Sequence, residues 1–176
     1  MAWQCFKNRD LGVISEALDI AEDITVNYYK FSTAQWKRHR FDVKTLLALK
    51  GDEITQGAFA LLNRGSGGTS NFELKTKIYD FYFICLQDHQ ILKATARDKR
   101  LMLLPLLVYI FTHELIHIVR FCNFFQRFDV AVKEREKEER IVHRTTFNIL
   151  KNIPMPDLDY VLDSYQGYRM CEIGAQ

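Results

Sequence analysis

The sequence has few of the features that mark an exported or disulfide-stabilised protein. Its four cysteines, Cys5, Cys85, Cys122 and Cys171, are widely separated and form no C-x-x-C pair. The opening stretch, MAWQCFKNRDLG, contains neither the basic n-region nor the apolar h-region of a signal peptide. We therefore expect reduced thiols in a cytoplasmic protein.

An excess of charge of one sign is also lacking. The 24 basic and 22 acidic residues nearly cancel, which argues against a nucleic-acid partner recruited by net charge. The chain has no internal repeat and no low-complexity tract. Its 176 residues suit one domain whose core needs neither disulfide nor metal for stability. A metal site in this chain would therefore serve function.

One segment, Leu101 to Val119, is almost continuously apolar and approaches the length of a membrane span. It nevertheless contains His113, Glu114 and His117, and basic residues close it at both ends. Ionisable groups of this kind are rare inside a bilayer. We expect a buried helix in a protein that does not enter the membrane; the alternative is a membrane span that carries these ionisable residues.

Hydrophobic spacing predicts an α+β protein that is predominantly helical, with an all-α fold as the alternative. The predicted helices cover residues 11–29, 33–49, 53–62, 105–125, 130–150 and 157–165. Residues 77–86 and 90–94 are expected to form a small β-hairpin just before the helix of residues 105–125. The apolar positions of the hairpin also fit one long helix, because a short apolar run does not separate the two periods.

The expected organisation is a single domain over residues 1–176. An N-terminal helical part, 1–64, is followed by a glycine-rich loop, 65–70. Residues 71–152 form the metal-site core and residues 153–176 a C-terminal helix.

The stretch FTHELIHIV, residues 111–119, carries two histidines and a carboxylate within the apolar segment. His113 and His117 are four residues apart, so a helix places both imidazoles on one face, where they can bind one cation. Glu114 lies about 100° around the helix from His113, within reach of a water on that cation. A metal site with Glu114 as general base is predicted. The alternative is a core helix whose histidines bond to backbone groups, although burying these residues is costly unless something pairs them.

Residues 110–119 resemble the HExxH helix of the zincin superfamily of metallopeptidases. The resemblance implies a zincin-like fold and a zinc cofactor held by His113 and His117. Glu114 would then polarise the water that attacks a peptide or protein substrate. The chain lacks the H-x-x-G-x-x-H continuation of the metzincin branch, so it is more similar to the thermolysin-like gluzincins, which take a third ligand from a glutamate on the next helix.

The helix predicted over residues 130–150 offers four glutamates for the third ligand. They are Glu134, Glu136, Glu138 and Glu139. A ligand must face inward, so it should share a stripe with the residues that turn the helix amphipathic, which leaves Glu138 and Glu139. We favour Glu139, because His143 one turn later could orient it or hydrogen-bond to the reaction centre.

Two other functions fit the same residues. Residues 114–117 form an E-x-x-H motif of the kind that helical di-metal carboxylate proteins use, but the chain has no second copy at the right spacing. The other alternative is a non-enzymatic zincin-like domain that binds metal or a protein partner. No motif identifies a regulatory partner.

Overall fold

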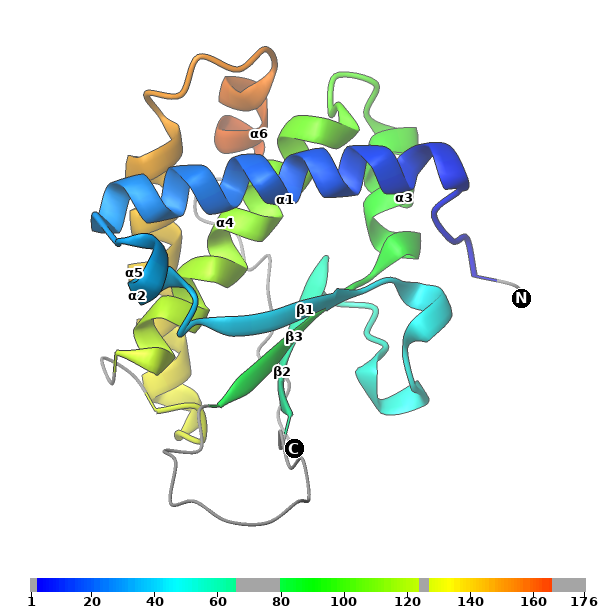
Figure 1. Cartoon of the computed structure of the whole chain (residues 1–176). Coiled ribbons are helices and arrows are strands. Elements are labelled where there is room, and N and C mark those ends of the chain that lie inside the picture. The colour runs from blue at the N-terminus through cyan, green and yellow to red at the C-terminus, as the bar shows by residue number, and fades with distance from the viewer. Residues whose placement is uncertain (1–2, 66–79, 124–126, 166–176) are drawn as a thin grey trace.

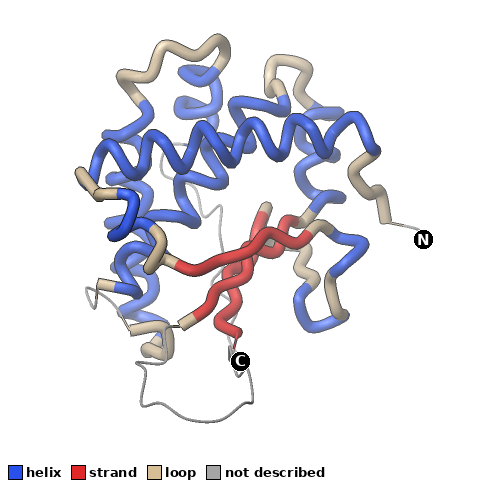
Figure 2. Tube along the Cα trace, in the orientation of Figure 1, coloured by secondary structure: helices blue, strands red, loops and turns tan. Residues whose placement is uncertain are grey.

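The structure is a computed structural model that describes residues 3–65, 80–123 and 127–165. These residues form an α+β protein that is predominantly helical, as predicted. The helices are α1 (Asn8–Tyr29), α2 (Thr33–Trp36), α3 (Asp88–Arg97), α4 (Leu103–Cys122), α5 (Val132–Leu150) and α6 (Leu158–Tyr165), with 3₁₀ helices η1 (Leu46–Ala48) and η2 (Gly51–Glu53). The strands are β1 (Arg40–Lys44), β2 (Ala60–Gly65) and β3 (Phe81–Leu86) (Figure 1, Figure 2).

Helix α4 lies at the centre of the fold, with α1, α5 and α6 packed around it (Figure 1). Every residue from Pro105 to Val119 is buried. A helix that is apolar nearly all round must lie inside its protein. Pro105 sits in the first turn, where a missing backbone N–H breaks no helical hydrogen bond.

Among the described residues, α4 is also the one helix long and apolar enough to cross a membrane. Of its most apolar stretch, 83% is buried within the protein itself. Burial by the surrounding chain is typical of the core helix of a soluble protein.

The sheet has three strands in the order β1-β3-β2. The central strand β3 pairs in parallel with β1 and antiparallel with β2, so that Ile84 lies between Val43 and Leu62. Tyr82, Ile84 and Leu86 alternate along β3 and join the hydrophobic core. The chain passes from β3 almost directly into α3, which ends shortly before α4 begins (Figure 2).

The predicted hairpin before α4 is wrong. Its first segment does contain β3, but residues 90–94 lie in α3. Ile91 and Ala94 in this segment are buried at helical spacing, and Asp88 provides the negative charge that a helix N-terminus favours. The strand β3 therefore pairs with two strands that come earlier in the chain, and the alternative of one long helix is wrong as well.

The N-terminal part, 1–64, was predicted to be helical. The structure instead places strand β1 and most of strand β2 in it. Ser32 does cap a helix, since its hydroxyl accepts the Gln35 N–H, but α2 ends at Trp36 and is followed by β1. The helix predicted over residues 53–62 is absent: η2 ends at Glu53, residues 54–59 are in neither helix nor strand, and β2 begins at Ala60. Both strands exist because they pair with β3, which is distant in sequence, and such pairing outweighs local propensity.

The remaining helices were predicted correctly. The segments 11–29, 105–125, 130–150 and 157–165 correspond to α1, α4, α5 and α6. Most of the predicted glycine-rich loop and the end of the predicted C-terminal helix, 166–176, lie outside the described residues.

Candidate metal centre

Helices α4 and α5 bring four of the predicted site residues together. His113 and His117 lie on one face of α4 and are fully buried. Glu139 and His143, also four residues apart, lie on the facing side of α5, with side chains that are 20% and 15% exposed. The i,i+4 spacing on each helix is what aligns each pair on a single face.

The side chains of His113, His117 and Glu139 converge, and we call these three residues the ligand triangle. The Nε2 atoms of His113 and His117 are 3.1 Å apart. Glu139 places Oε2 3.3 Å from His113 Nε2 and Oε1 3.1 Å from His117 Nε2. In a tetrahedral zinc site with bonds of about 2.0–2.1 Å, neighbouring ligand atoms stand about 3.3 Å apart. Each of these three contacts is close to that spacing, with the two Glu139 contacts made by different carboxylate oxygens.

Buried polar atoms without hydrogen bonds gather at the same place. Among the described residues these include both carboxylate oxygens of Glu139, Nε2 of His143 and Oε1 of Glu114. Although the Glu139 oxygens are close to the histidine nitrogens, they are not aligned to accept hydrogen bonds from them. Orphaned buried polar atoms are costly, and a cation among them would remove that cost. The donor set of two imidazoles and one carboxylate suits zinc.

One detail departs from the usual zinc site. The Nδ1 atoms of His113 and His117 have no hydrogen-bond partner among the described residues. Zinc-bound histidines commonly donate their second ring N–H to a carboxylate or carbonyl. The described part of the chain does not supply that outer hydrogen bond.

Charge interactions within the cluster lower the pKa of Glu139 and raise the pKa of His117. Burial alone would raise the pKa of Glu139, but the positive charge of His117 and the contacts from His113 hold it well below its ordinary value. Burial would lower the pKa of His117, yet the Glu139 carboxylate outweighs burial and raises it. These shifts describe an ionised carboxylate beside a positively charged His117, and binding of a metal would require His117 to give up its proton.

Glu114 lies next to this cluster and is 1% exposed. Its negative charge also acts on His117 and on the buried Cys85 thiol of β3. Burial, followed by the charge of Glu53, raises the pKa of Cys85 to about 12. Cys85 is therefore a neutral thiol at physiological pH and does not compete as a thiolate ligand.

His143 stands one step outside the triangle. Its Nε2 is 3.8 Å from Glu139 Oε2, and its ring centroid is 4.6 Å from that of His113. Its other nitrogen, Nδ1, lies 3.1 Å from the hydroxyl of Tyr109, which is buried one turn before His113 on α4. Tyr109 was not among the predicted site residues, although its spacing of four residues from His113 places it on the same helix face.

Glu138 is not brought to the histidines, which corrects its place among the predicted ligands. Its carboxylate accepts hydrogen bonds from Nε and Nη2 of Arg120, the latter at 3.0 Å. Because neighbouring residues on a helix point about 100° apart, only one of Glu138 and Glu139 can face His113 and His117. Glu134 and Glu136 are exposed.

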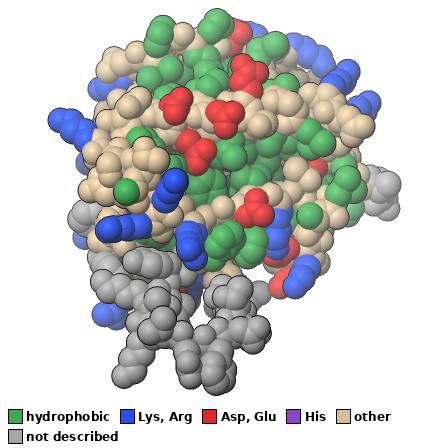
Figure 3. Space-filling model, in the orientation of Figure 1, with side chains coloured by type: hydrophobic (Ala, Val, Ile, Leu, Met, Phe, Trp, Pro, Cys, Tyr) green, Lys and Arg blue, Asp and Glu red, His purple; other side chains and the backbone are tan. Residues whose placement is uncertain are grey.

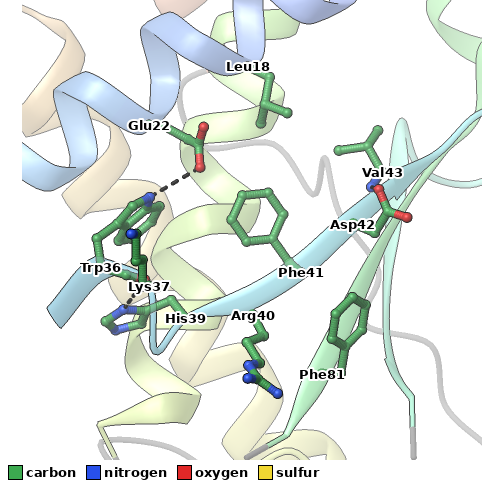
Figure 4. A pocket seen from close by; sticks show the side chains of 10 residues that line it. All are labelled: Leu18, Glu22, Trp36, Lys37, His39, Arg40, Phe41, Asp42, Val43 and Phe81. Carbon is green, nitrogen blue, oxygen red and sulfur yellow. Dashed lines mark hydrogen bonds between the residues drawn. The ribbon is translucent and has the colours of Figure 1, made fainter. Parts of the chain in front are cut away.

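A separate groove lies between α1 and β1 and shares no residue with the cluster. Figure 3 shows hydrophobic side chains gathered on this face of the molecule. In the close view of Figure 4, Glu22 of α1 accepts a hydrogen bond from the Trp36 indole, and Phe41 of β1 lies between α1 and Phe81. The groove holds no grouping of metal-ligand side chains like that between α4 and α5.

No protein-family model matches the chain, and neither a curated protein sequence nor a solved structure matches it. The resemblance to zincins therefore rests on residues 110–119 alone. Function has to be argued from the geometry of the site.

Proposed function

We propose that the protein is a zinc-dependent hydrolase that cleaves peptide bonds in a peptide or protein substrate. The observation that carries this proposal is the convergence of His113, His117 and Glu139, whose nitrogens and carboxylate oxygens approach one another at 3.1–3.3 Å. It is supported by Glu114, a buried carboxylate beside the triangle with an unpartnered oxygen among the described residues.

Zinc in this site would supply Lewis-acid polarisation of the substrate carbonyl and lower the pKa of its water toward neutrality. Glu114 accepts the proton of the attacking water and passes it to the leaving amine. Nε2 of His143, 3.8 Å from Glu139 Oε2, would be placed to donate a hydrogen bond to the oxygen on which negative charge develops. Tyr109, through its contact with Nδ1, holds the His143 ring in this orientation.

We also propose that the protein is cytoplasmic. Cys5, Cys85 and Cys122 are free thiols in the structure, which suits a reducing compartment. The burial of α4 within the protein supports a function away from the membrane. The near balance of charge supports a substrate other than nucleic acid.

The first test is the metal content of the purified protein by elemental mass spectrometry, beside His117→Ala. We expect about one zinc per chain in the wild type and none in the variant. No metal in either protein, even after zinc reconstitution, would make α4 a plain core helix. Two irons per chain would instead favour the di-metal carboxylate alternative.

The second test is cleavage of a peptide library by the zinc-loaded protein and by Glu114→Gln. Loss of the general base is expected to reduce cleavage by about 10²–10⁴-fold while zinc stays bound. If the wild type binds zinc but cleaves no peptide, and Glu114→Gln alters only stability, the protein is a non-enzymatic metal-binding domain.

A further inference from the structure

The two metal-site helices run antiparallel, and side-chain contacts fix their register at three levels. Along the pair these contacts are Arg120–Glu138, His117–Glu139 and Tyr109–His143. Residues later in α5 contact residues earlier in α4, as expected of antiparallel helices. Glu139 is thus bracketed by one polar contact on each side.

The contact between Arg120 and Glu138 is a partly buried, bidentate ion pair. Nε of Arg120 donates to one carboxylate oxygen of Glu138 and Nη2 to the other. The Glu138 side chain is only 3% exposed and that of Arg120 is 19% exposed. The planar guanidinium matches both oxygens at once, which fixes orientation as well as distance.

The first half of α5 has few other buried contacts. Glu138 is the first buried residue of α5, all of whose residues are described, and the next is Val142. The turns before Glu138 carry a run of charged residues that are mostly exposed. The rotation of α5 about its axis at Glu139 therefore depends strongly on the ion pair at the preceding residue.

Both members of the pair are adjacent to proposed ligands. Arg120 lies three residues after His117 on α4, on a neighbouring part of the same face. Glu138 directly precedes Glu139, so turning Glu138 toward Arg120 directs Glu139 about 100° away, toward the histidines. A rotation that broke the ion pair would also move the Glu139 oxygens out of the triangle.

We propose that the Arg120–Glu138 pair is a positioning clamp that holds Glu139 at ligand distance from His113 and His117. This inference rests on the proposed zinc site, although neither member of the clamp lies within the ligand triangle. Both are positioning residues, acting through the orientation of α5.

The test is zinc affinity, measured by competition with a chromogenic chelator, for the full chain carrying Glu138→Gln, Arg120→Gln or Arg120→Lys. Loss of an outer partner typically weakens metal binding by about 10–100-fold, and we expect this for Glu138→Gln and Arg120→Gln. Arg120→Lys keeps the positive charge but not the planar group that donates to both Glu138 oxygens. It should therefore retain more zinc affinity than Arg120→Gln. The absorption bands of the cobalt-substituted protein should shift in the same variants, because ligand geometry changes.

The matched control is Lys44→Gln. Lys44 and Glu53 also form a partly buried ion pair, 22% and 10% exposed, but it joins β1 to η2 instead of α4 to α5. We expect it to reduce stability without changing zinc affinity or the cobalt spectrum. If Lys44→Gln weakens zinc binding as much as Arg120→Gln does, the effect is general destabilisation and the clamp is rejected.

The outcomes separate this inference from the proposed function. Wild-type zinc affinity in Glu138→Gln and in both Arg120 variants, with binding lost in Glu139→Gln, would overturn the clamp and leave the zinc site standing. A wild-type protein that binds no zinc would remove both. If Glu138→Gln fails to fold, Arg120→Lys decides the matter, because it leaves the buried carboxylate with a cation.

Discussion

Two buried imidazoles whose Nε2 atoms stand 3.1 Å apart cannot both carry a proton on those atoms. Either one ring donates to the other, or both turn a lone pair toward a cation. Glu139 bears on this choice, since its oxygens lie 3.3 Å from Nε2 of His113 and 3.1 Å from Nε2 of His117. A shared cation satisfies all three residues at once, whereas a single shared proton satisfies two.

Replacing Glu139 with glutamine tests this argument directly. The amide keeps the shape of the side chain but removes the charge that binds zinc. Zinc affinity should fall by more than the roughly 10–100-fold that the loss of an outer partner costs. Isothermal titration of zinc into apo-protein measures the change. Glu134→Gln, an exposed position on the same helix, is the control and should bind zinc like the wild type; equal affinity in the two variants would contradict the ligand assignment.

Tyr109→Phe isolates the role of His143. The variant loses the hydroxyl that contacts Nδ1 and leaves the metal ligands in place. A hydrogen bond of about 1 kcal/mol corresponds to about fivefold in rate, so kcat should fall by about fivefold at unchanged zinc content. Steady-state kinetics on a library-selected peptide would measure it. Tyr160→Phe removes a tyrosine hydroxyl that donates to Asp98 and should leave kcat unchanged; a wild-type kcat in Tyr109→Phe would exclude the proposed orienting contact.

At the scale of elements, the sequence predicts best the helices whose apolar residues recur at helical spacing. Helices α4 and α5 lie within a few residues of their predicted bounds. The strands fail for a physical reason, since β1 and β2 exist only through pairing with β3, and their partners are distant in sequence. Residues 90–94 were predicted as a strand but lie in α3. A short apolar run next to a strand is compatible with either a helical or a strand period, so the pattern alone does not decide.

The contrast between local spacing and long-range contacts also explains which site residues could be predicted. His113, Glu114 and His117 are linked by spacing within one helix, and Glu139 by its stripe on the next. Arg120 could not be assigned a role, because its contact with Glu138 requires the antiparallel register of two helices. That register depends on side-chain packing that a single sequence does not display.

Asp88 provides an element-scale prediction away from the site. Its carboxylate, fully buried at the start of α3, accepts backbone N–H groups from Phe6 at 2.9 Å and Leu46 at 2.9 Å. It therefore ties the N-terminal segment and η1 to the end of β3. Asp88→Asn presents an N–H where an acceptor is needed, so it should cost about 1–3 kcal/mol of unfolding free energy. Urea denaturation gives the value, and the exposed Asp159→Asn should change it by less than about 0.5 kcal/mol. An equal change in both variants would show that Asp88 holds nothing together.

At the scale of the whole molecule, we expect the fold to form without the proposed metal centre. The core joins residues of α1, the sheet and α4 to α6, and most of these side chains lie away from the ligand triangle. A chain of 176 residues buries enough surface to fold without metal. The proposed zinc site would then be an addition to a stable scaffold, unlike the structural sites of small zinc-dependent domains.

This argument predicts that chelation lowers the melting temperature without unfolding the protein. Zinc that binds only the folded state at about 100 times its Kd adds about 2.7 kcal/mol. In a chain of about this size each kcal/mol shifts Tm by about 2–4 °C, so removing zinc should lower Tm by about 5–11 °C. Thermal melts by circular dichroism with and without a chelator would measure the shift. His117→Ala should melt at the same temperature in both conditions, because it has no zinc to lose. Loss of all helical signal at 25 °C on chelation would instead make the metal structural, since the fold would then depend on the ligand triangle for its stability.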